Sequence, residues 1–312
     1  MKFRESKVEI IPQDWSLEGI YKQCELAGRT AYKSEDRITE GSAKKFVEAL
    51  MKLKHGAVLE HGTIYLKYES ELVRGVQECD VLFQKYKNNK FSVYNTSKVT
   101  LRNETIVGGY VTTNLRVLME NDWMDDLQYL CEPTEYHERR VTVKFICSRS
   151  IAQEITRHRV FSFLMESQRY VGYNKDKFGG EITIIVPEWI KARINDIASY
   201  NNNDDLARMS YAEALRDGRM HEDKAIIMWA VSQEMSEAHY LSLTSELNVK
   251  AEEARSVLTN DCKTELVMTG FISDWEHFFD LRSKGTTGKP HPDVKILADT
   301  LYLEFINKGY LK

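Results

Sequence analysis

Residues 141–160 read VTVKFICSRSIAQEITRHRV. The first eight of them alternate apolar and polar side chains, which is typical of a strand with one buried face. A helical stretch follows from Ile151. The same alternation occurs in TIYLKYE at 63–69, and residues 4–11 are a further strand candidate. The chain therefore combines strands with helices, and we expect an α+β fold.

Two helices are expected near the N-terminus. Ser16 is a suitable N-cap for a helix over 16–28. A second helix is expected over 42–54, ending at His55 and Gly56, because glycine readily takes the left-handed conformation at the end of a helix.

The C-terminal half is more clearly helical. The expected helices cover 204–216, 222–246, 250–258 and a last segment from near Pro292 to just before Gly309. The tract 70–136 gives mixed signals, with a strand or turn followed by a helix within 106–121. No Pro-, Gly- or Ser-rich linker divides the chain, so we expect one continuous domain over 1–312.

The composition sets limits on function. The 312 residues include 43 Lys and Arg against 47 Asp and Glu, a net charge of −4, which argues against a general nucleic-acid coat protein. The chain has neither an apolar run of about 20 residues that could span a bilayer nor a start of signal-peptide type. Its five cysteines are scattered without a CxxC pair, so we expect reduced thiols in a cytoplasmic protein, without a disulfide framework or a metal site.

The densest polar and aromatic stretch is RHRVFSFLMESQRY at 157–170. It combines three arginines, one histidine and two serines, and guanidinium and hydroxyl groups are good phosphate ligands. Phe161, Phe163 and Tyr170 are interleaved, which suits a half-buried segment beside a flat ligand. The same composition also fits a solvated basic face of a helix, and composition alone leaves both interpretations open.

The spacing adds a more specific signal. Arg-His-Arg at 157–159, then seven residues, Ser167, one residue and Arg-Tyr resemble the signature of the flavin-dependent (alternative) thymidylate synthases. Upstream, HGAVLEH at 55–61 resembles a family segment that precedes a strand. Downstream, Ala254 and Arg255 resemble the family's Ala-Arg pair on a helix.

The segment FDLR at 279–282 resembles a Leu-Arg pair late in the family's sequences. The resemblance covers roughly 16–69 and 141–307. Residues 70–136 then correspond to an enlargement over the shorter family members.

Carried over position by position, the resemblance implies two sets of ligand contacts. The residues implied at FAD are His55, Glu60, Arg157, His158, Arg159 and His277. The residues implied at dUMP are Glu154, Arg157, Glu166, Ser167, Gln168, Arg169, Arg255 and Arg282. Arg282 would be the catalytic residue, facing the uracil ring and favouring its N3-deprotonated form. Its head is expected to be free at the end of an amphipathic run.

The resemblance implies synthesis of dTMP from dUMP. Methylenetetrahydrofolate would supply the one-carbon unit, and FAD reduced by NADPH would supply the hydride. It further implies an antiparallel-rich sheet flanked by helices, assembled as a homotetramer with shared active sites. No nucleic acid, membrane or metal is expected as a partner.

Two alternatives remain open. Leu164 and Met165 stand where the family commonly has Asn-Glu, with Glu166 one position later, which is compatible with a related flavoprotein that lacks synthase activity. The arginines and aromatics of 157–170 are also compatible with a protein that binds single-stranded nucleic acid. Turnover of dUMP would distinguish a synthase from the flavoprotein without synthase activity. Flavin absorbance of the purified protein would distinguish a flavoprotein from the nucleic-acid-binding protein.

Overall fold

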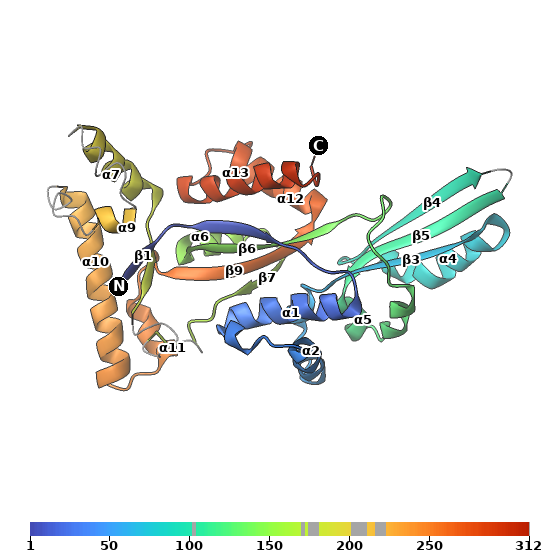
Figure 1. Ribbon diagram of the computed structural model, residues 1–312, viewed down its shortest axis with the longest axis horizontal. Coiled ribbons are helices and arrows are strands. Elements are labelled where there is room, and N and C mark those ends of the chain that lie inside the picture. Colours follow the sequence, from blue (N-terminus) through green and yellow to red (C-terminus); the bar gives the residue numbers. More distant parts are fainter. Residues whose placement is uncertain (102–103, 170–171, 174–180, 201–210, 216–222, 312) are drawn as a thin grey trace.

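The computed structural model describes residues 1–312 apart from 102–103, 170–171, 174–180, 201–210, 216–222 and 312. Figure 1 shows a central sheet with helices on both of its faces. A second sheet extends from one end of this centre, and a helical group lies at the other end.

The central sheet has four antiparallel strands in the order β2-β6-β9-β7. These strands are β2 (Lys7–Ile11), β6 (Arg140–Ser148), β9 (Lys263–Phe271) and β7 (Ser162–Met165). Because successive side chains of a strand point to opposite faces, one face of this sheet is apolar and the other is polar. The site described below depends on this difference.

The apolar face is covered by three helices. They are α6 (Arg149–Ile155), α12 (Ile272–Phe279) and α13 (Pro292–Asn307). Phe145 and Met268 of the sheet are fully buried in one cluster with Trp275 and Phe305 of these helices. Burying side chains of this size is a major source of stability, about 1.5–3 kcal/mol each relative to exposure.

The opposite face is polar and is covered by α1 (Leu17–Tyr32). Thr142 and Thr269 share a hydrogen bond of 2.8 Å between their hydroxyl oxygens, and His61 Nδ1 lies 2.8 Å from the Thr269 hydroxyl. Burial and the neighbouring Arg140 lower the pKa of His61 to about 3, so its ring is neutral at pH 7. A neutral ring in this position joins the central sheet to the segment that precedes the second sheet.

The second sheet has the antiparallel order β3-β5-β4 and forms the end of the molecule beyond the central sheet (Figure 1). Its strands are β3 (Thr63–Glu71), β5 (Glu104–Asn114) and β4 (Val93–Leu101). The helices of this part are α2 (Ser42–Lys52), α3 (Gly56–Leu59), α4 (Leu72–Lys87) and α5 (Leu115–Glu120), with 3-10 turns at Glu35–Arg37 and Met124–Tyr129.

The helical group at the other end packs around a short parallel pair, β1 (Lys2–Arg4) and β8 (Thr183–Ile185). Its helices are α7 (Glu188–Tyr200), α9 (Tyr211–Ala214), α10 (Lys224–Leu241) and α11 (Ala251–Ala254). A π-helical turn (Ser242–Glu246) follows α10, and a 3-10 turn (Arg255–Val257) follows α11.

The predicted α+β class with mainly antiparallel sheets is confirmed. Ser16 caps α1, whose end at Tyr32 lies four residues beyond the expected one because Lys33 takes the left-handed conformation there. The strand and helix expected within 106–121 are β5 and α5. The helix expected at 204–216 lies outside the described residues except for α9.

The expected role of Gly56 is wrong. Helix α2 ends at Lys52, and Lys54, with φ of 55°, takes the left-handed position instead. Gly56 begins α3, where a Cβ atom would lie 2.7 Å from Arg116 Nε. Gly56 thus lies against the side chain of a residue 60 positions away and does not terminate α2.

Among the described helices, none combines the length and the apolar character needed to cross a bilayer.

Candidate active site

The candidate site is organised by Arg282, which lies in the π-helical turn Asp280–Lys284 directly after α12. Its Nε donates a hydrogen bond to His158 Nε2 at 3.0 Å. Its Nη1 donates to Glu154 Oε2 and its Nη2 to the Glu154 carbonyl, both at 3.2 Å. The expectation of a free Arg282 head is wrong, because the guanidinium is fixed against the end of α6 and the following turn.

This arrangement leaves part of the guanidinium available. Arginine has five N–H groups, and three of those of Arg282 bond to Glu154 and His158. The two others have no hydrogen-bond partner among the described residues. Arg282 therefore presents donors with a fixed orientation, because the ion pair with Glu154 restricts its rotamer.

His158 is buried and electrically neutral in this setting. Burial, followed by the charges of Arg282 and His277, lowers its pKa to about 4. Its Nε2 is therefore unprotonated at neutral pH and accepts the hydrogen bond from Arg282 Nε. The ring also packs edge-on against Phe278 of α12, with centroids 5.0 Å apart.

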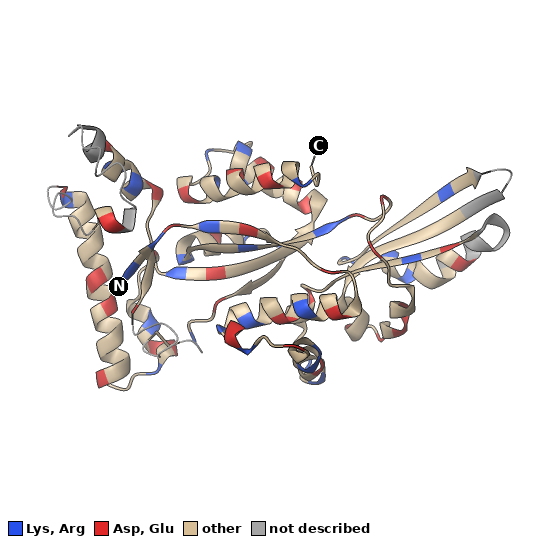
Figure 2. Cartoon of the chain, viewed as in Figure 1, with Lys and Arg blue, Asp and Glu red and all other residues tan. Residues whose placement is uncertain are grey.

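A cleft of about 510 Å³ opens beside this junction. Its lining includes Arg157, His158, Arg159, Val160, His277, Leu281, Arg282, Thr287, Gly288, Lys289 and Pro290. The lining contains no carboxylate. Elsewhere along the described chain, Lys and Arg are interspersed with Asp and Glu (Figure 2). The chemistry of the cleft therefore fits an anionic ligand.

Residues 157–159, His277 and Arg282 thus come together in one place, with Glu154 behind Arg282. His55 and Glu60 do not line this cleft. His55 is exposed before α3, and Glu60 forms an ion pair with Arg116. A role for these two residues at FAD stays a prediction.

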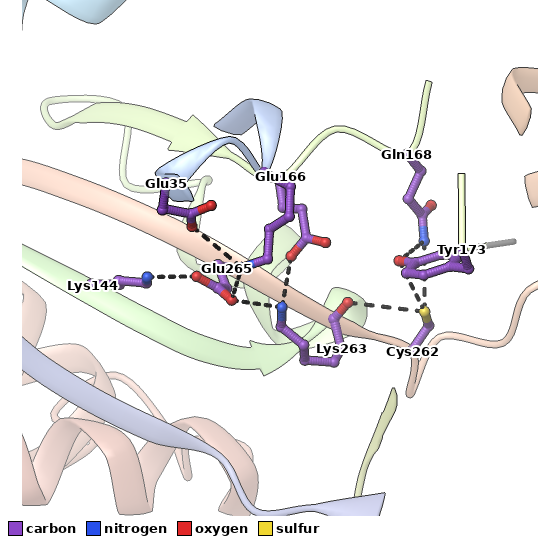
Figure 3. A network of polar contacts seen from close by, with 9 residues as sticks. Glu35, Lys144, Glu166, Gln168, Tyr173, Cys262, Lys263 and Glu265 are labelled. Atoms are coloured by element: carbon purple, nitrogen blue, oxygen red, sulfur yellow. Dashed lines mark hydrogen bonds and ion pairs between the residues drawn. The ribbon is translucent and has the colours of Figure 1, made fainter. Parts of the chain in front are cut away.

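Glu166 lies at the other end of β7 in a buried network of charges on the polar sheet face (Figure 3). It is only 2% exposed, and its Oε2 lies 2.9 Å from Lys263 Nζ. Lys263 also bonds to Glu265 at 2.7 Å, and Lys144 lies 2.5 Å from Glu265. These lysines and Lys33 hold the pKa of Glu265 well below its usual range despite its burial.

The segment after Glu166 starts from this network. The Ser167 N–H donates to the Ala31 carbonyl of α1 at 2.9 Å. Gln168 is buried, and its amide contacts Tyr173 OH at 3.4 Å and Cys262 Sγ at 3.7 Å (Figure 3). Tyr170 lies outside the described residues.

Two arginines at this end remain exposed. Arg169 Nε lies 3.5 Å from a Glu252 carboxylate oxygen, and Arg255 Nε donates to the Glu252 carbonyl at 3.1 Å. Both guanidinium groups therefore gather around one residue of α11. Their exposure leaves them accessible to a soluble anion.

Apart from His55 and Glu60, the predicted site residues therefore form two groups at opposite ends of β7. This strand has four residues and is about 13 Å long at the usual rise per residue. One group surrounds Arg282 in the cleft, and the other consists of residues 166–169 with Arg255. The structure does not join the two groups within one chain.

The cysteines are poor nucleophiles in this fold. Burial raises the pKa of Cys24 and of Cys147 to about 12 and that of Cys131 and of Cys262 to about 11. Cys79 is buried too. Because the thiolate is the reactive form, these environments do not favour covalent thiol catalysis.

Two features of the site were not found from the sequence. Lys263 contacts Glu166 across 97 positions, so no local pattern points to it. Lys289 and its neighbours enter the cleft through the turn GTTGKP at 285–290, whose two glycines next to a lysine were a local signal. In the described part of the chain, no group of three or more His, Cys, Asp and Glu side chains is arranged to hold a metal ion.

The family described as "Thymidylate synthase complementing protein" matches residues 133–308. The match covers more than half of the chain, and the chain belongs to this family. The resemblance drawn from residues 157–170 and their surroundings is thereby confirmed.

Among known relatives, a flavin-dependent thymidylate synthase of Corynebacterium efficiens is 30% identical over 151 residues, 48% of this chain and 50% of that protein. A probable flavin-dependent thymidylate synthase of Paramecium bursaria Chlorella virus 1 is 27% identical over 167 residues, 53% of this chain and 66% of that protein. The chain thus spans about half of the length of the first of these relatives.

Two solved structures are also similar. A UMP/dUMP methylase from Streptomyces cacaoi bound with 5-Br dUMP has a TM-score of 0.42 and 16% identity, covering 98% of this chain and 93% of that chain. Thymidylate synthase X from Helicobacter pylori with FAD and dUMP has a TM-score of 0.33 and 15% identity, covering 77% and 91%.

The network around Glu166 gives a testable prediction about stability. Lys263→Met should lower the free energy of unfolding by about 3 kcal/mol, because it leaves a buried carboxylate without its ion-pair partner. Lys144→Met is the matched control, since Lys144 is similarly buried but pairs with Glu265 alone, which keeps Lys33 and Lys263. Urea denaturation of both variants measures the difference.

A second substitution tests the cause of the effect. Adding Glu166→Gln to Lys263→Met should restore part of the lost stability, because the unpaired charge is then removed. Equal destabilisation by the two lysine variants, with no recovery in the double variant, would contradict a special dependence of Glu166 on Lys263.

Proposed function

We propose that this protein methylates dUMP to dTMP, with methylenetetrahydrofolate as one-carbon donor and with FAD, reduced by NADPH, as hydride source. The observation that carries the proposal is the fixed guanidinium of Arg282, whose free N–H groups lie beside a cleft rich in cations. The family membership of residues 133–308 supports the same activity.

The cleft residues fit an anionic flavin cofactor. Arg157 and Arg159 are exposed there and form no ion pair with any described residue, so their charges are available to phosphate groups. His158 and His277 would contact the cofactor from the same wall, and His55 and Glu60 would orient it from another segment. Bound in reduced form, FAD would supply the hydride.

Arg282 would act as the catalytic residue on the pyrimidine. Its charge cannot be lost at neutral pH, and its orientation is set before substrate arrives by Glu154 and His158. A fixed positive charge at the uracil favours the N3-deprotonated form and stabilises negative charge that develops as C5 attacks. Glu154 would contribute by holding Arg282 and by contacting the uracil edge.

The dUMP phosphate and sugar would be bound by Ser167, Gln168, Arg169 and Arg255, with Arg157 between the two ligands. Glu166 would position the start of this loop through its ion pair with Lys263. Because this loop and the Arg282 cleft lie at opposite ends of β7, we propose a homotetramer with shared active sites, in which the loop of one copy completes the cleft of another.

We further propose that the chain acts as one domain over 1–312 in the cytoplasm, with residues 70–136 as an enlargement over the shorter family members. The second sheet and α4 contain most of this tract. It lies at the end of the molecule away from α10 (Figure 1).

The activity is tested directly by product formation. We expect formation of dTMP from dUMP only when FAD, NADPH and methylenetetrahydrofolate are all present. Chromatography of the nucleotides measures the product. Reduction of the flavin by NADPH without any formation of dTMP would instead indicate the related flavoprotein without synthase activity. Tight binding of single-stranded oligonucleotides without any bound flavin would favour the nucleic-acid alternative.

The role of Arg282 predicts a specific kinetic defect. Arg282→Ala should slow single-turnover oxidation of the reduced flavin by dUMP and methylenetetrahydrofolate at least about a hundredfold, because a transition-state interaction is lost. Arg282→Lys should recover only part of the rate, since lysine keeps the charge but not the planar fork. Stopped-flow absorbance measures both rates.

Lys284→Ala is the matched control, because Lys284 lies in the same turn but is exposed and pairs with Asp280. It should turn over at the wild-type rate. If Arg282→Ala also reaches that rate at saturating dUMP, Arg282 is only a binding residue and its catalytic role is wrong.

A further inference from the structure

The turn at residues 285–290 forms one wall of the cleft with a defined shape. The Thr286 N–H donates to the Asp280 carbonyl at 3.0 Å, and the Gly288 N–H donates to the Gly285 carbonyl at 3.1 Å. Gly285 and Gly288 have φ of 70° and 148°, values that favour glycine. A Cβ atom on Gly285 would lie 2.9 Å from Pro290 Cδ, so the turn is closed tightly on itself.

This closed turn holds Lys289 at the cleft in an unusual electrostatic setting. Lys284 and Lys295, the neighbouring lysines in the chain, both form ion pairs with carboxylates one helical turn away. Lys289 forms no ion pair with any described residue, and the same holds for Arg157 and Arg159. Three of the four Lys and Arg side chains that line this cleft thus have no ion-pair partner among the described residues, and the lining itself contains no carboxylate.

Gathering like charges without counter-ions is unfavourable unless an anion joins them. The charge of Arg282 is already offset by its ion pair with Glu154, so Arg282 is not one of the unpaired cations of the cleft. The three remaining charges of Arg157, Arg159 and Lys289 need an anionic partner of their own. The proposed ligands of the dUMP phosphate, Arg169 and Arg255, lie at the other end of β7.

We propose that Lys289 is a phosphate-binding residue that, together with Arg157 and Arg159, binds the diphosphate of the flavin dinucleotide. This inference rests on the proposed function and deepens it, because it assigns the 285–290 turn to recognition of FAD. The two arginines supply planar, bidentate contacts. Lys289 adds a compact charge from the turn at residues 285–290, which is distant from the arginines in the sequence. The flavin ring itself would not need Lys289.

The experiment compares flavins with and without the diphosphate. The Kd of flavin-stripped protein for FAD and for riboflavin is measured by flavin fluorescence, for the wild type, Lys289→Ala and Lys284→Ala. Lys289→Ala should weaken FAD binding about tenfold, the loss of one charge-assisted contact, and leave riboflavin binding unchanged. Lys284→Ala should match the wild type for both flavins.

Salt gives a second readout. The fall in FAD affinity with rising ionic strength should be shallower for Lys289→Ala than for the wild type, because one screened charge pair is gone. Lys284→Ala should keep the wild-type slope. Circular dichroism of the stripped proteins confirms that the variants are folded.

Three results would overturn the inference while leaving the proposed function intact. They are equal FAD affinities of Lys289→Ala and Lys284→Ala, equal weakening of FAD and riboflavin, and a Lys289→Ala effect on the KM for dUMP or NADPH without one on FAD. A wild-type protein that binds no FAD would contradict the proposed function itself, and with it this assignment.

Discussion

The site depends on the three hydrogen bonds that Arg282 makes with His158 and Glu154. They tie the turn after α12 to the end of α6 and thereby fix the wall on which residues 157–159 lie. The bond to His158 requires a neutral ring, which burial and the neighbouring Arg282 and His277 favour by lowering the pKa of His158. Without this contact, the cationic residues of the cleft would have no common frame, and the proposed orientation of the pyrimidine would be lost.

The central sheet explains why the two halves of the site differ. Its apolar face, with α12 and α13, holds the Arg282 junction against a rigid aromatic core that includes Trp275. Its polar face instead carries Lys263, Glu265 and Glu166, whose charges are paired beneath α1. Buried ion pairs add little net stability. They are suited to hold the start of residues 166–169 in one conformation, which is the role we propose for them.

Local patterns predicted much of the fold. Alternation marked β3 and β6, and Ser16 and Pro292 marked the starts of α1 and α13. The spacing of 157–170 marked the family. The errors have a common physical cause. Gly56 lies against the side chain of Arg116, and Arg282 forms hydrogen bonds with residues more than 120 positions away. Tertiary contacts of this kind leave no trace in sequence periodicity.

The central claim is that flavin and dUMP occupy one site organised by Arg282. It is tested most directly by adding dUMP to the FAD-loaded protein and recording the visible absorbance of the flavin. We expect a saturable change in the flavin bands, because in the proposed site the pyrimidine and Arg282 would lie against the cofactor. Binding of dUMP, established separately by calorimetry, without any change in the flavin spectrum would contradict it.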